Sequence, residues 1–220
     1  MRRDAVGLLV AAMIVLGVGQ AIPAPKPADI PIHWQLDASF QDILPIQVTA
    51  GGQDAPRTFW YLRYTITNKT GQDRVFVPEF ILYTDTGQVL RAGRNIPGEV
   101  FQAIKEQLND PLLLDLPDMA GRVLQGPENA KEGVAIWNDF DPNAGAFDVF
   151  VSGLSGETVE VPLPKPIRVI ETDAFGKQTE VVKDKIILAK TLQRHYRIAV
   201  EAADRSHTAL PLAEEQWVMR

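Results

Sequence analysis

Residues 59–67 show a period-two pattern in which every second side chain is apolar, and this is the clearest pattern in the chain. Successive side chains of a β-strand point to opposite faces, so the segment predicts a strand with one apolar face. Asn68 and Gly71 follow directly, and both residue types tolerate the positive φ of a tight turn. The apolar face of this predicted strand carries Trp60, Leu62, Tyr64 and Ile66.

Short segments of the same kind recur along the chain, with turn residues between them. We expect residues 59–67, 74–83 and 88–91 to form an antiparallel meander, because only tight turns separate them. Pro78 has no N–H to donate, which predicts an edge position or a bulge at that point. A hairpin turn is predicted at residues 173–176. The remaining predicted strands cover residues 134–137, 147–151, 157–161, 167–171, 179–182, 186–188 and 194–200.

One segment, residues 97–108, has helical rather than strand periodicity. Val100, Ile104 and Leu108 recur every four residues, which places them on one face of a helix that we expect to pack on the sheet. Pro97 suits the start of such a helix. Many short strands with one short helix predict the fold class: mainly β, an Ig-like antiparallel β-sandwich.

The N-terminal residues 1–21 have the organisation of a secretory signal peptide. Two arginines precede an apolar run over residues 5–18, and Gly19 and Ala21 stand where a signal peptidase requires small side chains. The run is shorter than the roughly 20 apolar residues that span a bilayer core. We therefore predict cleavage after Ala21 and a periplasmic or secreted protein. An uncleaved signal that anchors the chain in the membrane stays open as the alternative.

Composition divides the remainder of the chain into three parts. Residues 22–31 contain four prolines and predict an extended, solvated spacer with polyproline II character. Residues 32–205 contain the predicted strands and helix without a repeat of fixed period, so we expect one β-sandwich domain. Residues 206–220 are expected to form a C-terminal tail.

Charge and cysteine content narrow the classes of partner and chemistry. The formal net charge is −6 at pH 7 and the basic residues are scattered, whereas nucleic acids and anionic membranes are bound by clustered Lys and Arg. We expect no nucleic-acid partner, and membrane contact only through an uncleaved signal. The chain has no cysteine, which excludes disulfides, thiol nucleophiles and thiolate metal sites. An exported protein without cysteine points to a bacterial origin.

The sequence contains no recognisable catalytic motif. His33, His195 and His207 lie far apart and in no zinc-binding spacing. Residues 152–156 lack the pattern of a nucleophile elbow, and neither a phosphate-binding loop nor a dinucleotide fingerprint is present. We therefore expect no catalytic residue and no cofactor, apart from the calcium candidate described next.

The best candidate for a metal site is the acidic loop over residues 138–148. Oxygen-bearing side chains alternate along it, as the ligands of a calcium loop do. It departs from the EF-hand pattern, because Gly145 stands one position late and the final Glu is missing. An ordinary turn is the other interpretation of the same residues. The candidate calcium ligands are Asp139, Asp141, Asn143 and Asp148.

Three segments resemble parts of uncharacterised exported bacterial proteins that carry an Ig-like β-sandwich domain. They are residues 61–71, in which a strand ends in Asn-x-Thr-Gly, and residues 80–87 and 129–137. The resemblance implies a β-sandwich and an exported location, and it supplies no catalytic residue.

Together, these features predict an exported, non-enzymatic β-sandwich protein that binds or scaffolds an envelope protein or a glycan. Two alternatives stay open: an extracytoplasmic hydrolase that uses paired carboxylates, and a calcium-stabilised adhesion-like module. A cleft that holds two carboxylates about 5–10 Å apart would favour the hydrolase. An exposed sheet edge or apolar patch would favour the binding protein.

Overall fold

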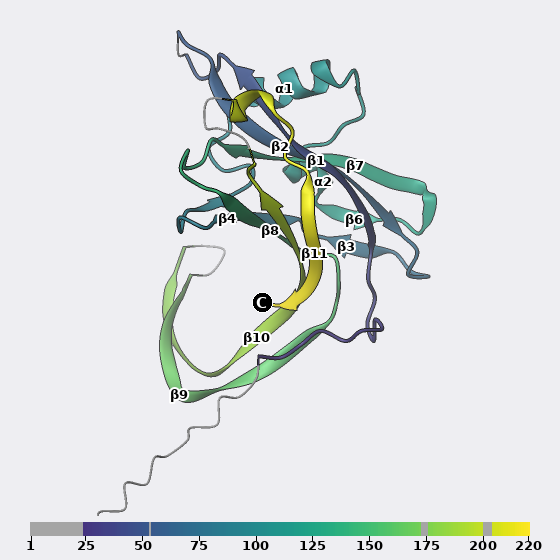
Figure 1. Cartoon of the computed structure of the whole chain (residues 1–220). Helices are drawn as coiled ribbons and strands as arrows, with labels where there is room; N and C mark the ends of the chain where they lie inside the picture. The colour runs from purple at the N-terminus through teal and green to yellow at the C-terminus, as the bar shows by residue number, and fades with distance from the viewer. Residues whose placement is uncertain (1–23, 53, 173–175, 200–203) are drawn as a thin grey trace, which may run out of the picture.

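The computed structural model describes residues 24–52, 54–172, 176–199 and 204–220, so the predicted signal peptide lies outside the described residues. The chain forms antiparallel sheets that pack face to face (Figure 1), which confirms the mainly β, antiparallel sandwich. The three-stranded sheet contains β1 (Asp37–Val48), β2 (Arg57–Asn68) and β7 (Gly126–Asn138) in that order.

The six-stranded sheet has β11 at one side and β5 at the other. Its order is β11 (Leu212–Met219), β10 (Gln178–Arg197), β8 (Ala146–Ser152), β4 (Glu79–Thr84) and β5 (Val89–Arg91), and β9 (Thr158–Thr172) pairs with β10. The third sheet contains β3 (Arg74–Phe76) and β6 (Gly121–Val123). The helical segments are α1 (Gly98–Gln107), α2 (Leu116–Met119) and the 3₁₀ turn η1 (Arg205–His207).

The main core fills the space between the two larger sheets. Trp60 and Leu62 of β2 meet Phe147 and Val149 of β8 in one buried cluster. Phe147 also stacks on Tyr196 of β10, with the ring centroids 5.0 Å apart. Buried aromatic side chains remove large apolar areas from water, so this interface stabilises a chain that has no disulfides.

A second, smaller core lies on the opposite face of the three-stranded sheet. Phe59 and Tyr61 of β2 pack there with Val100 and Ile104 of α1, and all four side chains are buried. Burial raises the pKa of the Tyr61 hydroxyl. The helix predicted over residues 97–108 is thus confirmed as α1, which covers the sheet as expected.

The predicted meander is wrong, because β2 belongs to a different sheet from the segments that follow it. β2 pairs with β1 and β7, and only β4 and β5 form the expected hairpin. The sequence predicted an edge position or a bulge of one strand at Pro78, but Pro78 lies between two separate strands, β3 and β4, which belong to different sheets. β1 was not predicted; its alternation is broken by a register shift between Phe40 and Ile43 and by Pro45.

β9 and β10 form a long hairpin that projects beyond the packed sheets and bends into a hook, drawn in green in Figure 1. We call residues 158–172 and 178–189 the arm. The pairing of Thr172 with Gln178 confirms the predicted hairpin, although turn residues 173–175 lie outside the described residues. The short strands predicted within 157–171 merge into β9, and those from residue 179 onward merge into β10.

The register of the arm shifts at its middle, where residues 163–166 of β9 lie opposite Asp184 alone. Pro164 and Pro166 fall inside this bulge and have no N–H for the ladder. Bulges bend the strand that carries them, so the prolines account for an interruption in otherwise continuous pairing.

Candidate interaction site: the arm and its base

The acidic loop singled out from the sequence contributes hydrogen-bond acceptors to the sandwich. Asp139 Oδ1 accepts hydrogen bonds from Trp60 Nε1 at 2.8 Å and from Arg205 Nη2 at 2.9 Å. Arg205 is buried and also donates to the carbonyl groups of Phe140 and Asp141, at 2.8 Å each. Asp139 is therefore part of a polar network that holds η1 against the loop.

Of the other three candidate ligands, Asp141 and Asn143 are hydrogen-bonded to each other, and Asp148 has a different partner. Asp141 Oδ1 accepts from the N–H of Asn143 at 2.9 Å, and this backbone donor is the main cause of the lowered pKa of Asp141. Asp148 lies on β8, where its Oδ1 is 2.9 Å from Nδ1 of His195 on β10. Among the residues that the structure describes, no three His, Cys, Asp or Glu side chains lie close enough together to hold a metal ion.

Calcium binding at this loop stays a prediction and has a direct test. Because Asp139 and Asp148 already pair with Arg205 and His195, we expect millimolar calcium to leave the melting temperature unchanged. A ligand that binds only the folded state raises the melting temperature. A rise with calcium that magnesium does not reproduce, and that Asp141→Asn abolishes, would establish the site instead.

A buried ion pair lies at the base of the arm. Lys190 Nζ is 3.1 Å from Glu157 Oε2, and the two side chains are 2% and 7% exposed. The backbone of Ala28 is hydrogen-bonded to both members of the pair. Its N–H donates to Glu157 Oε1 at 2.8 Å, and its carbonyl oxygen accepts from Lys190 Nζ at 3.2 Å. The Ala28 N–H is the main cause that lowers the pKa of Glu157. The Lys190 ammonium also lies 5.3 Å from the centre of the Trp217 ring.

The ion pair connects the N-terminal residues to the sandwich. Residues 24–31 belong to the proline-rich stretch expected as a solvated spacer, yet Ala28 is hydrogen-bonded to both partners of the buried pair. Within the segment expected as a C-terminal tail, residues 212–219 form β11, which pairs with β10. Both ends of the described chain therefore meet at the base of the arm.

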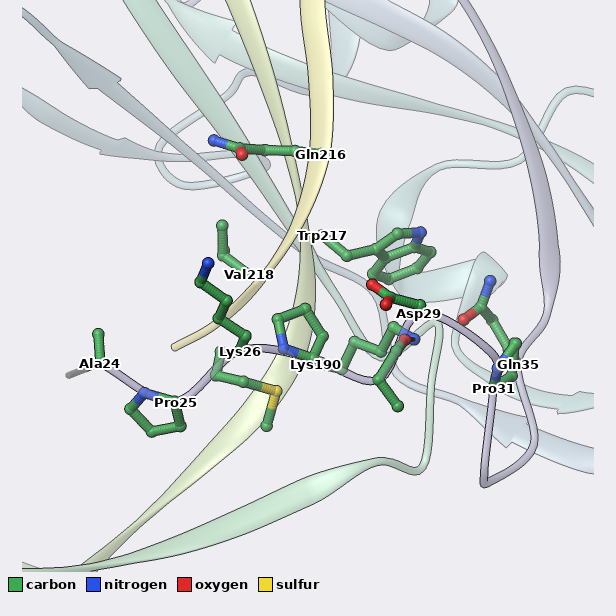
Figure 2. Close-up of a pocket in the computed structure, with 13 residues that line it drawn as sticks. Ala24, Pro25, Lys26, Asp29, Pro31, Gln35, Lys190, Gln216, Trp217 and Val218 are labelled. Carbon is green, nitrogen blue, oxygen red and sulfur yellow. Dashed lines mark hydrogen bonds between the residues drawn. The ribbon is translucent and has the colours of Figure 1, made fainter.

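An open groove of about 690 Å³ lies between residues 24–31 and the end of β11 (Figure 2). Trp217 contributes an indole ring to its lining, and Asp29, Gln35 and Gln216 contribute polar groups. Gln35 Oε1 is buried and has no hydrogen-bond partner within the described chain. The groove thus combines apolar and polar lining at the point where the arm leaves the sandwich.

The arm itself exposes large apolar side chains. Ile170, Val182 and Ile187 are 68%, 63% and 64% exposed although they lie in regular strands. A two-stranded hairpin is marginally stable in water unless it packs on something else. Cross-strand ion pairs on its surface each contribute little, about 0–1 kcal/mol. They join Arg168 to Glu180, Lys183 to Glu171 and Lys185 to Glu160.

Sequence reasoning did not identify the arm as a site. Its apolar residues fit the alternation of an ordinary half-buried strand. A local pattern does not show whether other parts of the fold will cover the apolar face of that strand. Three prolines at alternate positions, 162, 164 and 166, are the signal that could have indicated an unusual strand. Their position in a paired strand is exceptional, because proline removes ladder hydrogen bonds.

Comparisons with protein-family models, with curated proteins and with solved structures found no match. The resemblance to exported Ig-like modules therefore stays a prediction. None of the helices in the described ranges is long and apolar enough to cross a membrane.

Proposed function

We propose that this chain is an exported, non-enzymatic protein of the bacterial envelope that binds or scaffolds a partner through the arm. The observation that carries the proposal is the exposure of Ile170, Val182 and Ile187 on a hairpin that projects from a packed sandwich. Apolar area left in water costs about 25 cal/mol per Å², so a partner that covers these side chains gains free energy from their burial. The exported location rests on residues 1–21 alone.

The carboxylates described above support a binding role rather than hydrolysis. Asp139 pairs with Arg205, and Glu157 pairs with the buried Lys190, so both carboxylates stabilise the fold. The hydrolase needs two carboxylates that face a substrate cleft, and the calcium module needs converging ligands. The described residues offer no observation that favours either alternative over the binding protein.

A photo-crosslinking amino acid at Val182 or Ile187 tests the proposal in cells that export the protein. We expect each position to capture a partner, because both side chains project from the arm into solvent. The same amino acid at Val75 or Val89 is the matched control. These two valines are 65% and 62% exposed, but they lie on β3 and β5 of the sandwich, and we expect no adduct there.

The pattern of adducts decides the proposal. No adduct at either arm position, with folded protein recovered in the envelope fraction, would refute a binding role for the arm. Equal yields at all four positions would also contradict it, since they would indicate non-specific capture. Circular dichroism of each variant establishes folding; substitutions at such exposed sites change stability by about 0.5 kcal/mol or less.

A further inference from the structure

Within the described residues, one edge of β10 has no strand partner over most of the arm. Ala189 exchanges two backbone hydrogen bonds with Arg220, at 2.8 and 3.0 Å, on the side where β11 lies. Lys190 donates its N–H to Glu157 on the opposite side, at 2.9 Å. Backbone groups alternate in direction along a strand, so the odd-numbered residues from 187 to 179 point toward the β11 side. In the described part of the chain, no strand pairs with that side of residues 178–188.

The other edge of the arm is interrupted by proline at its middle. Pro162 pairs with Lys185, whose backbone groups point away from β9, so the Pro162 nitrogen faces the outer edge of β9. Pro164 and Pro166 follow in the same strand. Proteins place proline on edge strands to prevent pairing with other chains. β10 contains no proline from Gln178 to Arg197, whereas β9 is interrupted by proline at its middle, so the edge of β10 is the longer continuous template for another strand.

We infer that the open edge of β10, from Thr179 to Ile187, accepts one extended strand of a partner polypeptide. The added strand would continue the line of β11 beyond Arg220, where the pairing of that strand with Ala189 ends. Main-chain hydrogen bonds supply the affinity of such β-augmentation, and side-chain contacts supply its specificity. This inference rests on the proposed function and states how the arm binds.

A second copy of this chain is a poor occupant of the edge, because most registers of two-fold antiparallel pairing set like charges against each other. In such a pairing, the central residue lies opposite the same residue of the other copy. A register centred on Lys183 or Lys185 therefore brings two ammonium groups together. A register centred on Asp184 pairs two carboxylates and also sets Lys183 against Lys185. A register centred on Val182 sets Glu180 against Asp184. Like charges directly opposite destabilise a strand pair, and registers centred nearer the sandwich overlap β11.

The side chains along the edge define the chemistry of the partner strand. On the face that carries the odd-numbered residues, Lys183 and Lys185 lie between Val181 and Ile187. Their carboxylate partners within this chain come from β9, on the side away from the open edge. A strand with acidic side chains at two alternate positions, flanked by apolar ones, complements this face. The occupant is therefore an extended, acidic–apolar segment of another protein.

A fused strand tests the inference on the full chain. We append Thr-Val-Thr-Glu-Thr-Glu-Thr-Ile directly after Arg220, which sets the two glutamates opposite Lys185 and Lys183. Hydrogen exchange by NMR is expected to slow by roughly tenfold or more at the amides of Lys183, Lys185 and Ile187. The control fusion replaces both glutamates with lysine and is expected to slow these amides much less. Amides that stay unprotected in the glutamate fusion, or that are already protected in the parent chain, would overturn the inference.

Crosslinking of the same fusion separates this inference from the proposed function. With the crosslinker at Val182, a covered edge is expected to lower the partner adduct by roughly tenfold relative to the parent chain, because the fused strand competes for the site. An undiminished adduct with a protected edge would show that the partner uses another surface of the arm. The edge inference would then fail while the proposed function stands. Absence of an adduct at both Val182 and Ile187 in the parent chain refutes the proposed function and the inference together.

Discussion

Replacing Lys190 with methionine is expected to lower the free energy of unfolding by about 3 kcal/mol, because it leaves the buried carboxylate of Glu157 without its cation. Methionine fills a similar volume, so the loss reflects charge rather than a cavity. The Ala28 carbonyl also loses its hydrogen-bond donor. Urea denaturation measures the change, and limited proteolysis reports release of the N-terminal residues. Lys69→Met, in an ion pair with side chains 62% and 55% exposed, is the control and is expected to change stability little.

The double variant Lys190→Met with Glu157→Leu is expected to recover much of the loss, since apolar residues of similar volume often replace a buried ion pair without cost. A double variant no more stable than Lys190→Met would contradict the role of the unpaired carboxylate.

The dependence of stability on acid pH gives a second test of this ion pair. The pKa of Glu157 is lowered from 4.5 in the folded chain, so its contribution is present above that pH and lost as the pH falls through the folded pKa. The stability gap between wild type and Lys190→Met should therefore narrow in acid.

Arg205→Met is expected to lower the free energy of unfolding by about 3 kcal/mol, because three acceptors lose a charged donor at once. The carbonyl group of Phe140 is buried in this network, so water does not readily replace the guanidinium. The guanidinium also lies over the Phe140 ring, 4.5 Å from its centre, and methionine removes that contact. Thermal and urea denaturation measure the loss.

Arg91→Met is the matched control for this substitution, because its ion pair with Glu79 has side chains 60% and 37% exposed. We expect the control to change stability by less than about 1 kcal/mol. Equal losses in the two variants would show that Arg205 contributes no more than a surface arginine. Asp139→Asn should cost less than Arg205→Met, because the amide oxygen still accepts from Trp60 Nε1.

Elements with strong local periodicity were predicted from the sequence. Residues 59–67 and 97–108 became β2 and α1, because the alternation and the four-residue spacing reflect burial against neighbouring layers. β1 and β11 were not predicted. A bulge interrupts the alternation of β1, and β11 is an edge strand without a fully buried side chain, so neither shows a clean pattern.

Strand partners were the least predictable feature of the fold. β2 is followed closely by β3 and β4 in sequence, yet it pairs with β1 and with the distant β7. Local alternation shows that a strand has an apolar face but not which strand lies beside it. The ion pair at the base of the arm depends on the same long-range choices, since Ala28 and Glu157 are separated by 129 positions.

The sequence by itself determined a cysteine-free, mainly β chain with one amphipathic helix, because composition and periodicity are local properties. It also supplied the predicted export signal and the three prolines that interrupt one edge of the arm. Only the tertiary structure decided that Asp139 binds Arg205, that Ala28 covers a buried ion pair, and that one edge of β10 is left unpaired. An open edge is defined by the strands that are absent beside it in the described fold, and no local pattern of residues carries that information.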